Sequence, residues 1–211
     1  MADEHGVNAL VRMANESPGE LTLVAIGPLT NVALATRLDP ALPQKYKRLV
    51  VMGGTIRGLG NVTTAAEFNA YADPEAVAVV FDGWPGLALA SWETTMGHGF
   101  SAEQVDVLLG IDSARAEFFR RITNRSIGVL EQIMGHKTLM APDLLAVAAA
   151  LEPDIVLKSE KHRVEVELTG KHTRGLTTVD WFDRSGKDPN VDVILEMDKD
   201  RLWEMLQAAI R

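Results

Sequence analysis

The N-terminal part of the chain alternates between amphipathic stretches and short apolar runs. Residues 5–17 repeat apolar side chains at helical spacing, which predicts an amphipathic helix. Residues 21–26 (LTLVAI) are continuously apolar, a pattern typical of a strand covered on both faces. A second helical segment around Leu34 and a second apolar run, Arg48–Met52, follow. This succession of helix, strand, helix and strand predicts βαβ units and a mainly parallel sheet.

The middle of the chain continues this alternation. Residues 73–75 (DPE) combine a capping side chain, a proline and an acid, which is typical of a helix start. Residues 87–91 form another apolar run, and Ser101 and Gln104 have the spacing of a capping box. The pattern predicts helices from residue 74 through 80, over 102–109, over about 112–134 with Phe118, Phe119 and Ile122 on the apolar side, and, as a buried helix, over 143–151.

Beyond residue 160 the pattern becomes that of antiparallel strands. Apolar and acidic side chains alternate over residues 164–168, which predicts a half-exposed antiparallel strand. Two more strands are expected over residues 177–182 and 191–197, and the apolar positions between Leu202 and Ala209 predict a closing helix. We therefore expect one α/β domain over residues 1–211, with an open, mainly parallel sheet, helices on both faces and a small antiparallel annex.

Composition and charge narrow the class of protein. Of the 211 residues, 46% are hydrophobic and 24% are charged, and the formal net charge is −8. This acidic balance argues against binding to nucleic acid, which requires clustered Lys and Arg. The chain has no cysteine, which excludes disulfides, thiolate metal sites and a cysteine nucleophile. Because the sequence contains neither a long apolar stretch nor a signal pattern at its N-terminus, we expect a cytoplasmic protein with no membrane partner.

A glycine-rich stretch follows the apolar run that ends at Met52. Residues 52–73 (MGGTIRGLGNVTTAAEFNAYAD) first break regular structure and then carry Asn61, Glu67 and Asn69. Ligands of open α/β sheets bind beyond the carboxyl ends of the strands, so these polar side chains predict a ligand site. The alternative interpretation is that they are loop residues whose side chains satisfy backbone groups.

Other chemistry has less support in the sequence. The glycines resemble the outer positions of a phosphate-binding loop, but Leu59-Gly60 occupy the positions that require Lys and Ser or Thr. The histidines are scattered without metal-site spacing, and no G-x-S-x-G elbow supports a serine triad. Asp143 opens an almost wholly apolar helix, where it serves either as an N-cap or as a ligand for a hard metal or substrate hydroxyls.

Several segments together resemble one family. Residues 23–34 (LVAIGPLTNVAL) are similar to the G-P-L-T-N segment of the inosine–uridine-preferring nucleoside hydrolases, and residues 50–74 to the family's most recognisable stretch, in which MGG leads through GN to AEFN and DPEA. Residues 141–148 (APDLLAVA) resemble its later aspartate-containing helix start, and the segment that begins Pro189-Asn190-Val191 matches its C-terminal pattern. The resemblance runs through nearly the whole chain and implies that the protein is a member.

The resemblance implies an activity and a role for each matching residue. Members of that family hydrolyse the N-glycosidic bond of ribonucleosides with a bound Ca²⁺, which gives ribose and a free base. Asp143 and the backbone carbonyl of Ile26 are the implied calcium ligands. Trp92 is a candidate for stacking on the base, or else a tryptophan that closes the core. The implied substrate-binding residues are Met52, Asn61, Glu67, Phe68, Asn69 and Asp143.

The sequence departs from the family in two places. The family's aspartate-rich loop, D-x-D-x-x-x-D-D, which supplies two calcium carboxylates and the general base, has no counterpart in these 211 residues. The chain therefore looks like the family without its first segment; its catalytic base is unknown, and Asp143 with one carbonyl makes a poor calcium site. Pro142 stands where several members carry a histidine that protonates the leaving base.

The sequence is compatible with three functions. The first is a calcium-assisted ribonucleoside hydrolase, which we expect to be inactive without the aspartate-rich loop. The second is a protein that binds a nucleoside or ribose, or acts as a scaffold, without hydrolysis. The third is an unrelated phosphate-binding enzyme. Because loss of a first strand would bare a sheet edge and apolar faces, we also expect a homo-oligomer.

Overall fold

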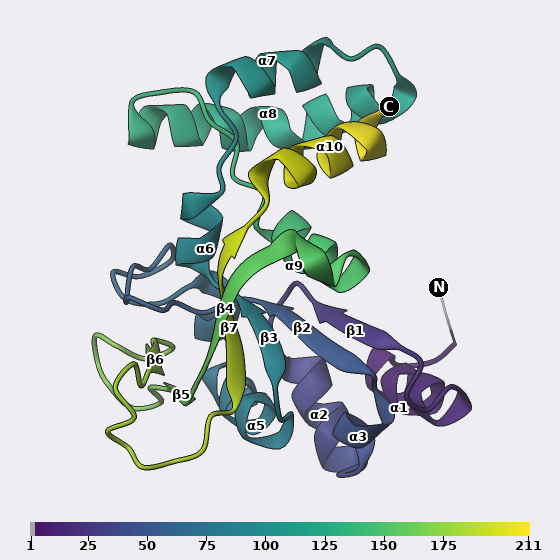
Figure 1. Ribbon diagram of the computed structural model, residues 1–211, viewed down its shortest axis with the longest axis vertical. Coiled ribbons are helices and arrows are strands. Elements are labelled where there is room, and N and C mark those ends of the chain that lie inside the picture. The colour runs from purple at the N-terminus through teal and green to yellow at the C-terminus, as the bar shows by residue number, and fades with distance from the viewer. Residues whose placement is uncertain (1–2) are drawn as a thin grey trace.

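The fold is built on a mostly parallel sheet, which the computed structural model describes within residues 3–211 (Figure 1). Its strand order is β1-β2-β3-β7-β4. The first four strands are mutually parallel, and β4 pairs antiparallel with β7. The strand bounds are β1 Thr22–Ala25, β2 Arg48–Met52, β3 Leu87–Ala90, β7 Val191–Met197 and β4 Val156–His162.

The register brings the carboxyl ends of β1, β2 and β3 to one edge of the sheet, which we call the carboxyl rim. Ala25 pairs with Val51, and Met52 pairs with Ala90. The chain segments that follow these strands therefore start side by side. This is the edge at which open α/β sheets bind ligands.

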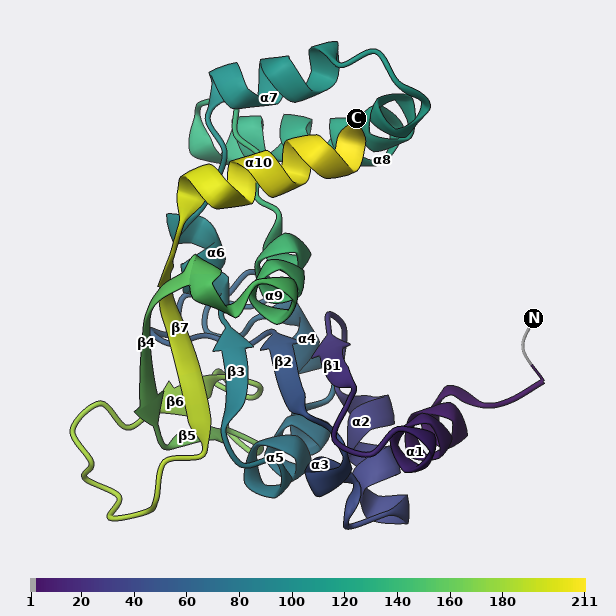
Figure 2. The same ribbon diagram turned by 45° about the vertical axis from the view of Figure 1, so that its right-hand side comes forward.

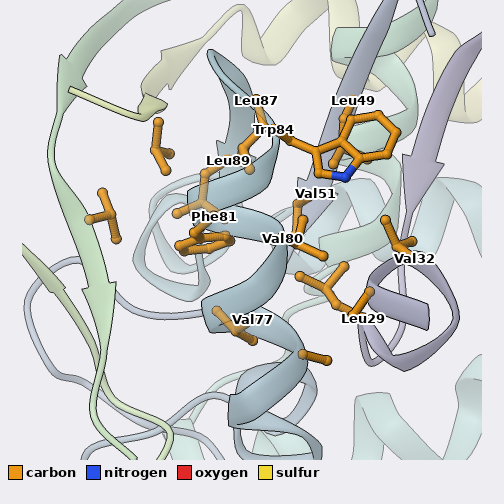
Figure 3. Packing of buried hydrophobic residues seen from close by; sticks show 14 of the residues in the cluster. Leu29, Val32, Leu49, Val51, Val77, Val80, Phe81, Trp84, Leu87 and Leu89 are labelled. Atoms are coloured by element: carbon orange, nitrogen blue, oxygen red, sulfur yellow. The ribbon is translucent and has the colours of Figure 1, made fainter. Parts of the chain in front are cut away.

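One face of the sheet packs against helices α1 Gly6–Glu16, α2 Thr30–Leu38, α3 Leu42–Lys45 and α5 Pro74–Gly83. Figure 3 shows Val80 and Phe81 of α5, and Trp84 directly after it, packed near the sheet residues Leu49 and Leu89. The Trp84 indole also donates a hydrogen bond from Nε1 to Thr36 Oγ1 at 2.8 Å, so its one polar atom is satisfied within the core.

The opposite face packs against α9 Pro142–Leu151, which contacts β1, β2 and β3. Beyond α9 lies a helical end, formed by α7 Ala102–Gly110, α8 Ala114–Met134 and α10 Lys199–Ile210 (Figures 1 and 2). The short helix α6 Trp92–Gly97 connects the carboxyl rim to this end. The sheet is thus covered on both faces, as the sequence predicted.

The antiparallel annex consists of β5 Val164–Val166 and β6 Thr177–Val179. Buried Asn190 ties it to the main body, because its side chain accepts a hydrogen bond from Val164 N at 2.7 Å and donates to Val164 O and Phe81 O at 3.0 Å each. Two short elements complete the description: α4 Phe68–Ala72 and the 3₁₀ turn Pro153–Ile155.

Several sequence predictions need correction. The residues of β1 are all half-buried rather than covered, because β1 is an edge strand. The strands expected over residues 164–168 and 177–182 end at Val166 and Val179, and α3, α4, α6 and β4 were not predicted. On α8, Phe118 and Ile122 are exposed, whereas Phe119 is partly buried against the core, as predicted. The buried residues of this helix are Ala116 and Ile127. Among residues 3–211, no helix combines the length and hydrophobicity that a membrane crossing requires.

The packing of α9 generates a stability prediction. Leu145 is fully buried, so Leu145→Ala should lower the free energy of unfolding by about 2–5 kcal/mol through lost burial and a residual cavity. Leu151 lies on the same helix but is 70% exposed, and Leu151→Ala should change stability by no more than about 0.5 kcal/mol. Urea unfolding followed by circular dichroism measures both. Equal losses would contradict the orientation of α9.

Candidate functional site

Glu67 connects the end of β2 to the start of α4. Its Oε2 accepts hydrogen bonds from Gly54 N at 2.8 Å and Ala70 N at 3.2 Å, and its Oε1 accepts one from Asn69 N at 2.9 Å. Glu67 is therefore the N-cap of α4, and only 2% of it is exposed. Burial raises the pKa of its carboxyl group, and the negative charge of Asp143 adds to that rise.

Asn69 lies beside Glu67 and reaches the last residue of β2. Its Nδ2 donates to Met52 O at 3.1 Å. Gly53 lies between these groups: a Cβ there would be 3.4 Å from Glu67 Oε2 and 3.6 Å from Asn69 Cβ. The structure therefore brings Met52, Glu67 and Asn69 together at the carboxyl rim. The side chains of Glu67 and Asn69 satisfy backbone groups there, as in the alternative interpretation that the sequence left open.

Asn61 joins the same group through Phe68. Its Oδ1 accepts a hydrogen bond from Phe68 N at 2.8 Å, next to Glu67 in the chain. The turn before it depends on Gly60, where a Cβ would lie 2.2 Å from Thr63 O. The Phe68 side chain is 56% exposed, so its ring is open to a ligand.

Asp143 is not the helix cap that its position suggested. The N-cap of α9 is Ala141, which forms no side-chain capping bond, and Asp143 lies one residue inside the helix. Burial raises the pKa of the Asp143 carboxyl group. The negative charge of Asp143 also contributes to the raised pKa of the Glu67 carboxyl group. This leaves the second interpretation of Asp143, as a ligand for substrate or metal, as the one to consider.

Trp92 and Ile26 lie on the same rim in different surroundings. The Trp92 backbone N donates to Gly54 O at 3.0 Å, and its half-buried ring packs against the core on the α9 side. This contact is the core-closing role that the sequence left open. Ile26 directly follows β1 and is 46% exposed.

The described residues do not fit a calcium centre on their own. Within residues 3–211, no group of three or more His, Asp or Glu side chains is arranged to hold a metal ion. The Asp143 carboxylate and the Ile26 carbonyl would supply too few oxygens, because Ca²⁺ takes about 6–8. We therefore assign no chemical step to a metal held by these residues.

One small hollow adjoins the carboxyl rim. It is lined by Met52, Gly53, Gly54 and Asn69 together with buried core residues such as Val77 and Phe81. Two larger open grooves lie elsewhere, between α2 and α5 and beside the start of α7, and none of the predicted site residues lines them. The polar groups of the rim, rather than the volume of a hollow, mark it as the candidate site.

Glu93 is a residue of this region to which sequence reasoning gave no role. It is the second residue of α6, and its carboxylate accepts hydrogen bonds from three backbone N–H groups in residues 56–59. The only signal in the sequence was its position directly after an apolar strand. Its partners are more than thirty residues earlier in the chain.

Comparison with known proteins shows which family the chain matches. The sequence model of the family described as inosine-uridine preferring nucleoside hydrolase matches residues 1–204. The pyrimidine-specific ribonucleoside hydrolase RihA of Salmonella newport is 34% identical and that of Citrobacter koseri 32% identical, each over 95% of this chain. The chain spans 64% of the length of these relatives.

Solved structures agree with the sequence matches. An inosine-guanosine nucleoside hydrolase superimposes with a TM-score of 0.89 at 34% identity, over 100% of this chain and 68% of its own. The plant nucleoside hydrolase PpNRh1 gives a TM-score of 0.89 at 26% identity, over 99% of this chain and 67% of its own. This chain therefore belongs to the inosine-uridine preferring nucleoside hydrolase family.

Proposed function

We propose that the protein hydrolyses the N-glycosidic bond of ribonucleosides to give ribose and a free base, and that the carboxyl rim of this chain holds the ribose. Family membership and the names of its relatives support the reaction. The observation that carries the assignment of the rim is the gathering of Glu67, Asn69 and Met52 at the carboxyl end of β2.

Several polar atoms of the rim are free to meet a ligand. In the described part of the chain, Asn61 Nδ2, Asn69 Oδ1 and both carboxylate oxygens of Asp143 take part in no hydrogen bond, while the other amide atoms of Asn61 and Asn69 bind backbone. One amide donor and three acceptor atoms suit the hydroxyl groups of a pentose, each of which can donate and accept. The rim is therefore equipped to bind sugar hydroxyls.

This set also suits the chemistry of bond cleavage. Departure of the base leaves an oxocarbenium-like cation on the ribose. Hydrogen-bond acceptors on the ribose hydroxyls, together with the negative charges of Glu67 and Asp143, would stabilise the positively charged transition state more than the neutral substrate. Hydrolysis also requires a base that takes a proton from water, and we assign that role to no residue of this chain. Calcium is proposed from the family alone.

Phe68 is the better candidate for contact with the base. It is more than half exposed and follows Glu67 directly, whereas the Trp92 ring is part of the core packing. Aromatic faces stack on nucleobases of any sequence. We assign no preference between pyrimidines and purines, because the named relatives include pyrimidine-specific and inosine-guanosine enzymes.

The alternative function is binding of a ribonucleoside without hydrolysis. The observation that favours it is the absence, among residues 3–211, of a carboxylate cluster that could hold a metal. Both functions require the same ribose contacts and differ in the release of base.

A binding and turnover experiment tests this proposal. Uridine and inosine are titrated calorimetrically into the 211-residue chain, and free base is measured by chromatography with and without added Ca²⁺. Asn69→Ala should weaken binding roughly tenfold or more, because it removes a hydrogen-bonding group from the ribose contacts. Exposed Asn15→Ala on α1 is the matched control and should leave affinity unchanged.

The outcomes separate the two functions. Release of base supports hydrolysis by this chain, and binding without release favours the alternative. A folded chain that binds neither nucleoside, or an Asn69→Ala variant with unaltered affinity, would contradict the ribose assignment.

We further propose that the chain forms a homo-oligomer through α8. The apolar residues Phe118, Ile122, Val129 and Ile133 are 47–72% exposed and follow one another at intervals of four, seven and four positions, which places them on one helix face. The intervals four, seven and four read the same from either end of the helix. A second α8 packed antiparallel would set Phe118 against Ile133 and Ile122 against Val129, as a two-fold interface requires.

A charge within this face should disrupt the assembly. Ile122→Glu should shift the mass measured by light scattering from dimer to monomer, because the carboxylate would be buried without a partner. Leu151→Glu, which alters an apolar residue on α9 that is also more than half exposed, should leave the dimer intact. A monomeric wild-type chain, or a dimer that persists in Ile122→Glu, would show that α8 is not the interface.

A further inference from the structure

The loop that follows β2 is held by the carboxylate of Glu93, which lies in α6 after β3. Glu93 Oε2 accepts a hydrogen bond from Ile56 N at 2.8 Å, and Glu93 Oε1 accepts bonds from Arg57 N at 2.8 Å and Leu59 N at 3.1 Å. Glu93 takes part in none of the ion pairs among the described residues. The dipoles of three peptide groups therefore stabilise its negative charge, as in the anion-binding concavities that successive N–H groups form.

This arrangement explains why the loop resembles a phosphate-binding loop without being one. Converging N–H groups in a glycine-rich loop are suited to an anion. Here the anion is the protein's own Glu93, so three loop amides are already occupied. This argues against the phosphate-binding enzyme that the glycine spacing left open.

The loop is fixed at both of its ends by neighbours of the ribose site. At its start, Gly54 N donates to Glu67, and Gly54 has a φ of 64° and approaches Thr177 so closely that a Cβ would lie 2.7 Å from Thr177 Oγ1. After its end comes Asn61, whose Oδ1 accepts the hydrogen bond from Phe68 N. Between these points, Glu93 supplies the bonds that hold residues 56–59.

We propose that Glu93 is a positioning residue of the ribose site: its carboxylate fixes the loop of residues 53–60 and thereby the place of Asn61. The role in ribose binding rests on the proposed function, whereas the ordering of the loop by Glu93 does not depend on it. A glutamine at position 93 has only one acceptor oxygen, and its amide NH₂ group would face an N–H donor. An alanine would leave the three amides without an acceptor.

Amide hydrogen exchange measured by NMR tests the loop directly. In Glu93→Ala the amides of Ile56, Arg57 and Leu59 should exchange roughly tenfold faster or more, because each loses a charge-assisted hydrogen bond. The Phe68 amide, which does not touch Glu93, should also exchange faster if Asn61 is positioned through the loop. Glu93→Gln should give a smaller change in all four amides.

A small carboxylate should restore the loop. Added acetate should slow exchange of these amides in Glu93→Ala and leave the wild-type chain unchanged, whereas chloride at the same ionic strength should not. Glu103→Ala is the control, since Glu103 is an exposed carboxylate on α7 bonded to the Ser101 hydroxyl. It should alter none of the four amides.

Uridine affinity provides the functional readout. Glu93→Ala should weaken binding roughly tenfold, and acetate should restore it. Unchanged exchange at residues 56–59 would overturn the proposal, and so would faster exchange there with the Phe68 amide and uridine affinity unaltered. If the wild-type chain does not bind uridine, the proposed function fails, while the Phe68 amide still decides whether Glu93 positions Asn61.

Discussion

The carboxyl rim depends on how the buried charge of Glu67 is satisfied. Taking a carboxylate out of water is unfavourable unless hydrogen-bond donors replace the solvent. Glu67 receives three backbone N–H groups, one from the end of β2 and two from the first turn of α4. A buried side chain therefore fixes the distance between a strand end and a helix start, which places Asn69 against Met52. Burial raises the pKa of the Glu67 carboxyl group, and the negative charge of Asp143 adds to that rise.

A second carboxylate extends the same principle along the chain. Glu67 holds the beginning of the glycine-rich loop, and Glu93 holds its middle. Glycine is required in this loop because neighbouring atoms approach its backbone closely, as at Gly60. The loop is thus ordered by acidic side chains rather than by an apolar core, and its polar neighbours are left to face a ligand.

The sequence predicted the parts of the fold that hydrophobic patterning controls. The burial of β2, β3 and α9 could be predicted because their sequences are almost wholly apolar. The short helix α4 was missed because its five residues follow a polar loop and it begins through a side-chain cap rather than through periodicity. The burial of β1 was overestimated, since an apolar run does not reveal that a strand lies at an edge. Asn61, Glu67 and Asn69 were predicted from their position after an apolar strand, and the family resemblance added Met52 and Phe68. Neither could indicate Glu93, because its bonds join residues 34–37 positions apart.

The central claim is that the amides and acids of the carboxyl rim bind a pentose. A crystal structure of the chain soaked with D-ribose tests it most directly. The account predicts one sugar whose hydroxyl groups lie within hydrogen-bond distance of Asn61, Asn69 and Asp143. A sugar bound in another groove, or crystals in which saturating ribose leaves the rim empty, would contradict it.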